Sequence, residues 1–393
     1  MKFTEMNLKP HFVEALQKQD ITEPTIVQSE SIPVLMQGKD LIVRSKTGSG
    51  KTIAFLLPIM QRLEPQGLQA LILAPTRELA EQIEKEIRKL DRNVGSLTVY
   101  GGVAIGPQME KLAEGVQIVV ATPGRVLDHM ERGTIDFRDL KFAVLDEADR
   151  MLDMGFIDDV QRILSGTPAT RQTALFSATM PAEIVMLSKD YMKPDVARIV
   201  LEQDEITVKN IRQVCYGLDQ REKLNTLIKV LSRTEVNKVM IFCNTKSWAE
   251  SLTRILQKKG MPVAELHSGL SQARRNQVIL DFKNNKIGIL VCTDVAARGL
   301  HIDDVSHVIN YDLPKNPKDY IHRIGRTGRA GEEGDAISFC TQNDEPLLKN
   351  IEREIQMTLD LQTLTGGKLT RVERPQMTAT ATVSDGDWGS LLD

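Results

Sequence analysis

The chain has 393 residues, which is too long for one hydrophobic core and predicts two to three domains, since a domain averages roughly 150 residues. Hydrophobic residues make up 41% and charged residues 26%, which excludes disorder for the bulk of the chain. The 50 basic and 53 acidic residues leave a net charge of −3, so nucleic-acid binding through bulk charge is excluded and only a local basic surface could provide it. Aromatic residues at 4% argue against a surface built mainly on base stacking.

The spacing of the cysteines and the hydropathy of the chain indicate the cellular compartment of the protein. The four cysteines, Cys215, Cys243, Cys292 and Cys340, are far apart and form no CxxC pair, which argues against a zinc ribbon or a disulfide scaffold and favours a reducing environment. The N-terminus carries no apolar segment after its charged residues, and no apolar run is long enough to cross a bilayer. We therefore expect a cytoplasmic protein without a membrane span.

Short runs rich in Val, Ile and Leu alternate with helix-length amphipathic stretches along the chain. Such runs predict parallel strands that are buried on both faces. The predicted strands are 40–44, 70–74, 97–100, 118–121, 142–146 and 173–177 in the first half, and 214–218, 239–243, 263–266, 288–292, 307–311 and 336–339 in the second. The pattern occurs twice without a short-period repeat, which predicts two α/β domains rather than a solenoid.

The domain boundary falls in the least periodic segment, Leu201–Gln213, where we place the linker. The predicted domains are 1–203 and 204–362. Beyond them the sequence is rich in Gly, Thr and Ser with few residues to bury, so 363–393 is predicted to be a disordered tail.

A glycine-rich segment, RSKTGSGKT, follows the first predicted strand and precedes a predicted helix. Its glycines let backbone N–H groups turn towards phosphate oxygens, and the helix N-terminus adds its dipole. Lys51 supplies a charge for the β- and γ-phosphates, and the Thr52 hydroxyl can bind Mg²⁺. The strict pattern has Gly where Ser45 stands, and a chance Gly-rich turn is the alternative. The residues expected to hold the nucleotide are Ser45, Lys46, Thr47, Gly48, Ser49, Gly50, Lys51 and Thr52.

Two acidic residues, Asp146 and Glu147, stand at the end of the apolar strand 142–146. The carboxyl ends of parallel strands are where α/β proteins bind ligands. A P-loop ATPase needs one carboxylate for Mg²⁺ and a second to activate the attacking water. With GSGKT earlier in the chain, we assign these roles to Asp146 and Glu147 in that order; the alternative is a solvated helix start.

Residues 146–149 spell DEAD, and with the motifs around them the chain resembles the DEAD-box RNA helicases from residue 3 to about 355. The resemblance implies two tandem RecA-like domains, each a mostly parallel sheet with helices on both faces, and an RNA-dependent ATPase that uses ATP and Mg²⁺. Pro24–Gln28 is similar to the family's adenine-reading motif, with Phe3 at the position that stacks on the base. The Gln28 amide can both donate to and accept from an adenine edge, which would select ATP over GTP.

Further motifs of the first half match the family in order. Ser177-Ala-Thr179 is similar to the motif that ties the ATP state to domain closure, and we expect Ser177 and Thr179 to form a hydrogen-bonded link with Asp149. Other matching segments stand just beyond strand ends, where short side chains and helix N-termini can hold RNA phosphates. For any one of these residues a helix-capping role is the alternative. The expected RNA contacts are Pro75, Thr76, Arg77, Gly102, Thr122, Pro123, Gly124 and Arg125.

In the second half, HRIGRTGR places three arginines within one short segment, His322–Arg329. A hydrolysing γ-phosphate develops charge on its oxygens, and an arginine finger accelerates hydrolysis by roughly 10³–10⁵. We assign Arg326 and Arg329 as fingers that also bind ATP; the alternative is a basic surface turn. The resemblance implies that His322 helps hold the attacking water against Glu147.

The remaining second-half motifs resemble those for RNA binding and coupling. The expected RNA contacts are Thr245, Gly269, Gln272, Arg275, Thr293 and Arg298. Asp294 is expected to couple the ATP and RNA sites. One departure concerns His301, which stands where the family has an Asp that reaches the ATP ribose, so the ribose contact is in doubt.

The resemblance implies a monomer with ATP between its domains and RNA across their shared face. Closure would bend the bound strand and expel its partner locally, and hydrolysis would release the RNA; a protein partner regulating closure is possible. Contacts to the RNA backbone predict binding that ignores sequence. Two alternatives remain open. One is an ATP-gated RNA clamp that nucleates a complex, and the other is a DNA translocase, which would lack DEAD and the context of Gln28.

Overall fold

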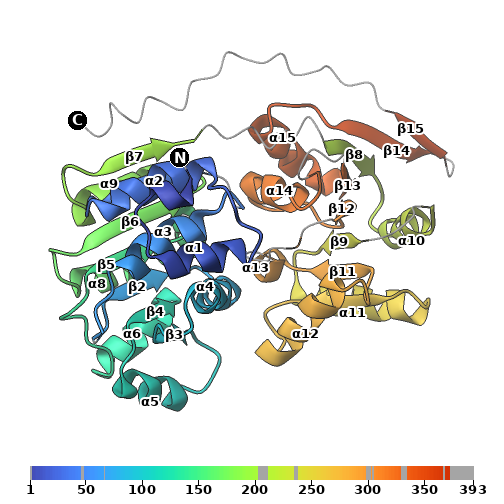
Figure 1. Cartoon of the computed structure of the whole chain (residues 1–393). Helices are drawn as coiled ribbons and strands as arrows, with labels where there is room; N and C mark the ends of the chain where they lie inside the picture. The colour runs from blue at the N-terminus through green and yellow to red at the C-terminus, as the bar shows by residue number, and fades with distance from the viewer. Residues whose placement is uncertain are drawn as a thin grey trace. The chain divides into compact units, whose positions relative to one another are not determined.

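A computed structural model describes residues 2–45, 48–65, 67–201, 211–233, 238–297, 302, 305–328, 334–365 and 368–371. The chain separates into two compact units, with the boundary between Gln203 and Asp204. Each unit is an α/β fold with helices on both faces of a central sheet (Figure 1). The predicted fold class, two α/β units each with a mostly parallel sheet, is confirmed.

Within the described residues, the first unit has a seven-stranded parallel sheet in the order β3-β4-β2-β5-β6-β1-β7. Its strands are β1 Leu41–Arg44, β2 Ala70–Leu73, β3 Ser96–Val99, β4 Ile118–Ala121, β5 Phe142–Leu145, β6 Gln172–Ser177 and β7 Ala197–Val200. Strands β2, β4, β5 and β6 are buried along their whole length, which explains why their sequences are apolar without alternation.

Helices cover both faces of this sheet. They are the 3₁₀ turn η1 Phe3–Glu5 and the helices α1 Pro10–Gln17, α2 Ile26–Met36, α3 Lys51–Gln61, α4 Arg77–Leu90, α5 Gly106–Glu114, α6 Pro123–Glu131, α7 Ala148–Asp153, α8 Ile157–Ser165 and α9 Ala182–Tyr191. Ile72 packs into the hydrophobic cluster that contains α3, whereas its neighbours Leu71 and Leu73 pack into the cluster that contains α8. Successive side chains of one strand therefore support opposite helical layers.

Among the described residues, the second unit has an eight-stranded sheet in the order β10-β11-β9-β12-β13-β8-β14-β15. Its strands are β8 Ile211–Gly217, β9 Val239–Phe242, β10 Val263–Leu266, β11 Ile289–Cys292, β12 His307–Asn310, β13 Gly334–Cys340, β14 Asp360–Thr365 and β15 Lys368–Arg371. Its helices are α10 Lys223–Arg233, α11 Lys246–Lys258, α12 Gln272–Lys283, α13 Asp294–Ala297, α14 Pro317–Ile324, the 3₁₀ turn η3 Gln342–Asp344, and α15 Glu345–Glu354. Strand β15 is antiparallel to β14, while the other pairs are parallel.

All twelve strands predicted from the sequence are present, with ends displaced by a few residues. The prediction of a disordered tail from residue 363 onward is wrong for residues 363–365 and 368–371, which belong to β14 and β15. Thr363 pairs with Gly217 of β8, and a Cβ atom at Gly217 would lie 3.1 Å from the Thr363 methyl group. These strands are held by backbone pairing, which a polar composition does not reveal. The other tail residues, 366–367 and 372–393, lie outside the described residues.

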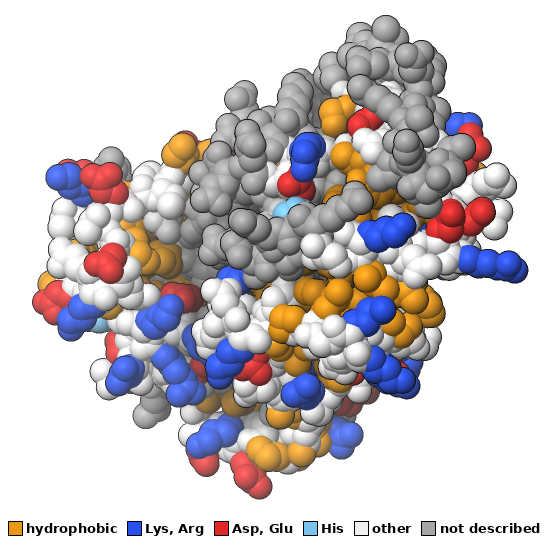
Figure 2. Space-filling model, turned by 90° about the vertical axis from the view of Figure 1, so that its right-hand side faces the viewer, with side chains coloured by type: hydrophobic (Ala, Val, Ile, Leu, Met, Phe, Trp, Pro, Cys, Tyr) orange, Lys and Arg blue, Asp and Glu red, His pale blue; other side chains and the backbone are white. Residues whose placement is uncertain are grey.

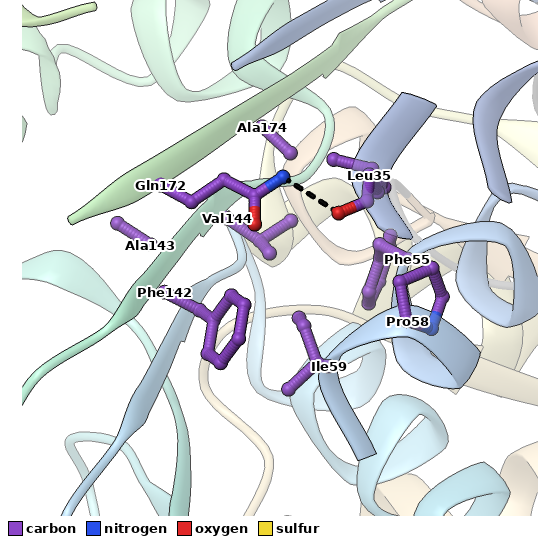
Figure 3. A pocket seen from close by; sticks show the side chains of 9 residues that line it. All are labelled: Leu35, Phe55, Pro58, Ile59, Phe142, Ala143, Val144, Gln172 and Ala174. Carbon is purple, nitrogen blue, oxygen red and sulfur yellow. Dashed lines mark hydrogen bonds between the residues drawn. The ribbon is translucent and has the colours of Figure 1, made fainter. Parts of the chain in front are cut away.

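A small cavity in the first unit lies against β5 and α3 (Figure 3). Its volume is about 10 Å³, and Phe55, Phe142 and Gln172 are among the residues that line it. A space of this size holds at most one water molecule, so it is a packing feature and not a ligand site.

The charged residues of the face shown in Figure 2 are mixed, with Lys and Arg side chains scattered among Asp and Glu. This distribution agrees with the net charge of −3 and leaves recognition of an anionic ligand to local groups. None of the helices in the described part of the chain is both long and apolar enough to cross a membrane.

Candidate functional site

The nucleotide loop connects β1 to α3 at the carboxyl edge of the first sheet. Gly48 and Gly50 have φ angles of 82° and 91°, a left-handed conformation that glycine adopts at little cost. The buried Ser45 donates its N–H to the carbonyl of Ser177 at 3.0 Å, and its hydroxyl lies 3.2 Å from that of Ser49. A serine in place of the usual glycine therefore fits the loop, because its side chain closes the turn. Lys46 and Thr47 lie outside the described residues.

Lys51 and Asp146 lie buried in the same region of the first unit. Lys51 is the first residue of α3, and its Nζ donates to the Ser45 carbonyl at 3.0 Å. Asp146 follows β5, and burial raises the pKa of its carboxyl to about 7, while the charge of Lys51 opposes this rise. A bound phosphate could replace the Ser45 carbonyl as the acceptor of Lys51. The glycine turns of the loop already favour an anion there, because they direct backbone N–H groups inward.

The residues available for Mg²⁺ are the Asp146 carboxylate and the hydroxyl of Thr52 on the first turn of α3. Oxygen donors are the ligands that Mg²⁺ prefers, so the set fits this ion. No group of three or more His, Cys, Asp or Glu side chains in the described chain could form a metal cage. A magnesium ion here would take its other ligands from phosphate and water, as is usual for this ion.

Glu147 has a strained backbone, with φ 53° and ψ 53° at the N-cap of α7. Left-handed geometry at a non-glycine residue costs of order 1–3 kcal/mol and is concentrated at functional sites. One carboxylate oxygen accepts a hydrogen bond of 2.7 Å from Arg150 Nη1. The turn and this bond fix the direction of the side chain, as the position of a general base requires.

The Pro24–Gln28 segment, predicted to read adenine, is hydrogen-bonded to the loop between β1 and α3. Gln28 is buried, accepts from the Thr25 N–H at 3.0 Å and donates from Nε2 to the Gly50 carbonyl at 3.1 Å. The Thr25 hydroxyl donates to the Ser49 carbonyl at 2.8 Å. A Cβ atom at Gly50 would lie 2.5 Å from Gln28 Nε2, so only glycine permits this approach. Phe3 is buried in the hydrophobic cluster of α1, α2 and α3, and adenine stacking by its ring stays a prediction.

The expected link between Asp149, Ser177 and Thr179 exists as three hydrogen bonds. Asp149 donates its N–H to the Ser177 hydroxyl at 3.0 Å. Its carboxylate accepts from the N–H and the hydroxyl of Thr179 at 2.8 and 2.9 Å. Because the Ser177 carbonyl also accepts from Ser45, one residue at the end of β6 joins the nucleotide loop to the DEAD segment.

The predicted RNA contacts of the first unit differ in their burial and in whether they cap a helix. Thr76 caps α4 by accepting from the Leu79 N–H at 3.3 Å, so its hydroxyl has a structural role. Thr122 precedes α6 without a side-chain cap bond. Pro75 and Pro123 are buried, and Gly124 is exposed. Capping thus accounts for Thr76 and not for Thr122.

Arg77 and Arg125 both lie against the Gly101–Gly102 segment. Gly102 has a φ of 81°, and a Cβ atom there would lie 2.4 Å from the Arg77 guanidinium. Arg125 donates from Nη2 to the Val103 carbonyl at 3.1 Å. The first unit therefore gathers two guanidinium groups and exposed backbone in one place, which is a composition suited to phosphate contacts.

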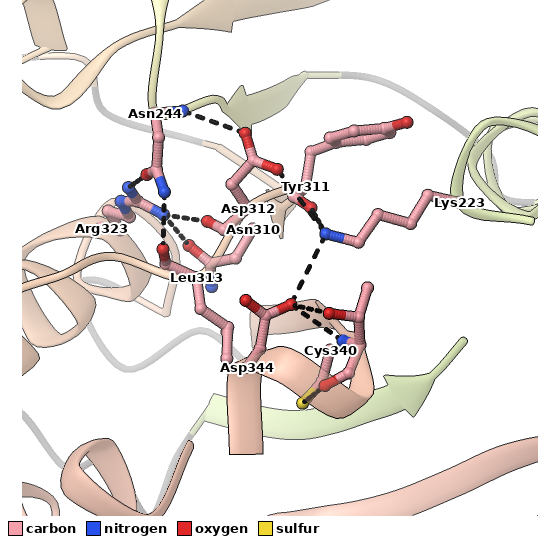
Figure 4. A network of polar contacts seen from close by, with 10 residues as sticks. Lys223, Asn244, Asn310, Tyr311, Asp312, Leu313, Arg323, Cys340 and Asp344 are labelled. Carbon is pink, nitrogen blue, oxygen red and sulfur yellow. Dashed lines mark hydrogen bonds and ion pairs between the residues drawn. The ribbon is translucent and has the colours of Figure 1, made fainter. Parts of the chain in front are cut away.

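Arg323 is the central polar residue of the second unit, and the sequence interpretation did not assign it a role. It is 1% exposed and donates to both Asp294 carboxylate oxygens at 2.6 and 2.7 Å. Its other hydrogen bonds go to Asn244, Asn310 and the backbone carbonyl of Asp312 (Figure 4). Its guanidinium also stacks on Phe242 at 5.0 Å. The one sequence signal was its place beside Tyr320 and Ile324 on the buried side of α14.

The candidate fingers follow α14. His322 is exposed, and Arg326 is half-buried. Thr327 donates its hydroxyl to the Ser306 carbonyl at 3.1 Å, and a Cβ atom at Gly334 would lie 2.4 Å from that hydroxyl. The segment after Arg326 is therefore held close to β12 and β13. Arg329 and His301 lie outside the described residues.

The predicted RNA contacts of the second unit include a helix cap, an exposed residue and a buried one. Thr245 caps α11 by accepting from the Trp248 N–H at 3.2 Å. Gly269 is exposed and donates its N–H to His267 Nδ1 at 3.1 Å. Arg275 is buried and donates to the carbonyls of His267 and Ala296, so its guanidinium links these two backbone segments. Gln272 begins α12, Thr293 follows β11, and Arg298 lies outside the described residues.

Comparisons with known proteins agree with this geometry. Residues 25–187 match the family model described as DEAD/DEAH box helicase, and residues 222–331 match the helicase conserved C-terminal domain. The chain is 44% identical to the ATP-dependent RNA helicase CshA of Listeria monocytogenes, over 89% of this chain and 68% of that protein. It is 43% identical to the RNA helicase CrhR of Synechocystis, over 92% of this chain and 74% of that protein.

The chain is also similar to solved structures of RNA-bound proteins. The chain is similar to Saccharomyces cerevisiae Dbp5 bound to RNA and ADP BeF3, with a TM-score of 0.80, 32% identity and coverage of 92% of this chain and 95% of that chain. It is also similar to Mss116p bound to single-stranded RNA and AMP-PNP, with a TM-score of 0.80, 31% identity and coverage of 92% and 78%.

Proposed function

The chain belongs to the DEAD-box family of ATP-dependent RNA helicases, and from this premise we propose that it separates short RNA duplexes locally, in a cycle driven by closing and reopening of its two units. The observation that carries the proposal is the double role of Ser177. Its carbonyl accepts from Ser45 of the nucleotide loop and its hydroxyl accepts from Asp149 of the DEAD segment. A movement of the nucleotide loop on loss of the γ-phosphate can thus be transmitted to the DEAD segment through the hydrogen bonds of Ser177, at the end of β6.

The proposed hydrolytic step uses side chains of both units. Lys51 binds the β- and γ-phosphates, and Glu147 accepts a proton from the attacking water, which His322 helps to hold. Arg326 and Arg329 stabilise the charge that develops on the γ-phosphate. Thr52 and Asp146 would hold Mg²⁺, which supplies neutralisation of phosphate charge when bound. Because the fingers and the base belong to different units, hydrolysis requires the units to close.

The proposed RNA contacts are to the sugar–phosphate backbone. In the first unit they are made by Arg77, Arg125 and the backbone near Gly102 and Thr122, and in the second by Thr245, Gly269, Gln272, Thr293 and Arg298. Phosphate contacts carry no sequence information, so binding is independent of sequence and weakens with salt. Asp294 and Asp149 couple the RNA surfaces to the ATP site.

We further propose a cytoplasmic monomer that can act with a regulatory protein partner. The four cysteines are buried free thiols, which is consistent with a reducing compartment.

A strand-displacement assay tests the proposal. The full chain, ATP and Mg²⁺ are mixed with a short and a long RNA duplex of the same end sequence, and with DNA duplexes of matching sequence. Local unwinding predicts rapid displacement of the short RNA strand and slow displacement of the long one. It also predicts that RNA, but not DNA of the same sequence, stimulates the ATPase. ATP-dependent RNA binding without displacement would identify an RNA clamp instead, and stimulation by DNA would identify a translocase.

A further inference from the structure

Gln108 of α5 is a buried glutamine whose amide joins three segments of the first unit. It is 6% exposed. Its Nε2 donates to the Tyr100 carbonyl at 3.1 Å, just after β3. Its Oε1 accepts from Arg125 Nη1 at 3.2 Å and lies 3.1 Å from His129 Nε2, both on α6. A glutamine that makes three such bonds away from water is held in one orientation.

His129 is fully buried, and its surroundings specify its tautomer. Nε2 faces the Gln108 amide oxygen, and Nδ1 lies 2.7 Å from the Thr134 hydroxyl. Because an amide oxygen only accepts, Nε2 carries the hydrogen, while the Thr134 hydroxyl contacts Nδ1 and also lies 3.2 Å from the His129 carbonyl. A flipped Gln108 amide would point its NH₂ group at the Arg125 guanidinium and its oxygen at the Tyr100 carbonyl, so these two groups fix the orientation of the amide. His129 then contacts the same amide oxygen as Arg125 and packs against it as a second donor.

Arg125 is held from the other side as well. Its Nη2 donates to the Val103 carbonyl at 3.1 Å, and its Nε lies 3.5 Å from the Asp128 carboxylate. Gln108 bonds Tyr100 on one side of the Gly101–Gly102 segment, and Arg125 bonds Val103 on the other. The glycine segment and the guanidinium are thus fixed relative to each other by one buried glutamine.

We propose that Gln108 and His129 are positioning residues for RNA binding, which hold Arg125 and the Gly101–Gly102 segment in the arrangement that receives RNA phosphates. The inference rests on the RNA contact proposed above for Arg125. A guanidinium fixed before binding loses less side-chain entropy when a phosphate arrives, so its contact contributes more to affinity. Neither residue touches the nucleotide loop, so the effect is directed at RNA and not at ATP.

The test is a double-mutant cycle in the full chain, with fluorescence anisotropy of labelled single-stranded RNA in the presence of a non-hydrolysable ATP analogue. Gln108→Leu is expected to weaken RNA binding about tenfold, because two donors lose their acceptor, and to leave ATP-analogue binding without RNA within about twofold. In an Arg125→Ala background the same substitution should have little further effect. Gln69→Leu is the matched control, because Gln69 is also buried and bonds the backbone of Glu64.

A second pair of variants keeps the test independent of the folding of Gln108→Leu. His129→Gln retains an amide donor for Gln108 and should bind RNA nearly as the parent does, whereas His129→Phe should weaken binding. Unchanged RNA affinity in folded Gln108→Leu and His129→Phe, or an equal loss in Gln69→Leu, would overturn the inference. Unchanged RNA affinity in Arg125→Ala would instead overturn the RNA contact on which the inference rests.

Discussion

Arg323 and Asp294 form a two-pronged ion pair, with guanidinium-to-carboxylate distances of 2.6 and 2.7 Å, inside the second unit. The remaining N–H groups of Arg323 donate to Asn244, Asn310 and the Asp312 carbonyl. An arginine has five N–H donors, and all five have acceptors here. Of the arginines in HRIGRTGR, Arg323 is therefore a structural centre, and a phosphate must be met by the ones that follow it.

Arg323→Lys should lower the free energy of unfolding of the second unit by about 3–5 kcal/mol, since it leaves buried partners of a bidentate pair without donors. Arg326→Ala should change that free energy much less, as expected for a half-buried side chain. It should instead reduce ATP turnover about 10³-fold, as expected for a finger. Urea unfolding and steady-state ATPase of the full chain measure both. Equal stability of the two variants would contradict the assignment.

Glu147→Gln should retain ATP and RNA binding while hydrolysis falls about a hundredfold or more, because the amide cannot accept the proton of water. The amide oxygen can still accept from Arg150, so the turn at residue 147 should persist. Single-turnover hydrolysis and RNA release are the measurements, and release should slow with hydrolysis. Glu131→Gln, an exposed acid paired with Arg162, is the control. Normal RNA release from a variant that cannot hydrolyse ATP would refute the coupling scheme.

Gly102→Ala should weaken RNA binding by displacing the Arg77 guanidinium, which lies 2.4 Å from the Cβ position. Gly133→Ala is a matched control, because Gly133 also has a positive φ, 65°, but has no atom within 4 Å of its Cβ position. Both variants should lose about 1–3 kcal/mol of stability from backbone strain. Only Gly102→Ala should show weaker binding in RNA anisotropy, and similar affinities in the two variants would count against the contact.

His129 should make the first unit less stable in mild acid. Burial and then the charge of Arg125 lower the pKa of His129 below its ordinary value of 6.5, against a smaller opposing effect of Asp128. The unfolded chain therefore binds more protons between the two pKa values, so this contribution is full above pH 6.5 and is lost as pH falls towards the folded pKa. His129→Gln should show a shallower loss of stability with falling pH in thermal melts from pH 8 to 5. Identical slopes would exclude the effect.

Two truncations should distinguish the contribution of strands β14 and β15 from that of the residues that follow them. Ending the chain after Arg371 keeps both strands, and the tail beyond is not basic, so ATPase and short-duplex unwinding should stay within about twofold. Ending it after Thr363 removes β15 and shortens β14, which should lower the melting temperature of the second unit. A large loss of unwinding on removal of residues 372–393 would show that they contribute to RNA binding.

Much of the fold could be predicted because parallel strands buried on both faces read as unbroken apolar runs, as in β5 and β11. Strand β7 was missed because it contains Arg198 and is only partly buried. Strands β14 and β15 were missed because their pairing is made by backbone groups, about which a polar sequence says little.

The nucleotide site was assigned from the sequence for a different reason: its motifs are local, so GSGKT and DEAD each predict their function from a few adjacent residues. Residues that act through distant partners were not found. Gln108 bonds Arg125 and Arg323 bonds Asp294, and nothing in the spacing of these residues reveals the contacts. Thr76 and Thr245 illustrate a further difficulty, since a hydroxyl at a helix start can cap the helix as well as contact RNA, and the sequence does not show that both hydroxyls accept a cap bond.

The strand order of the first sheet sets the sequence of events during synthesis. Strand β1, which carries the nucleotide loop, pairs with β6 at residues 174–177 and with β7 at residues 197–200. None of its neighbours in the sheet is made until nearly the whole first unit has left the ribosome. Non-local parallel pairing of this kind forms slowly. A nascent chain therefore exposes GSGKT well before β6 and β7, the two strands that hold β1 in the sheet, have been translated.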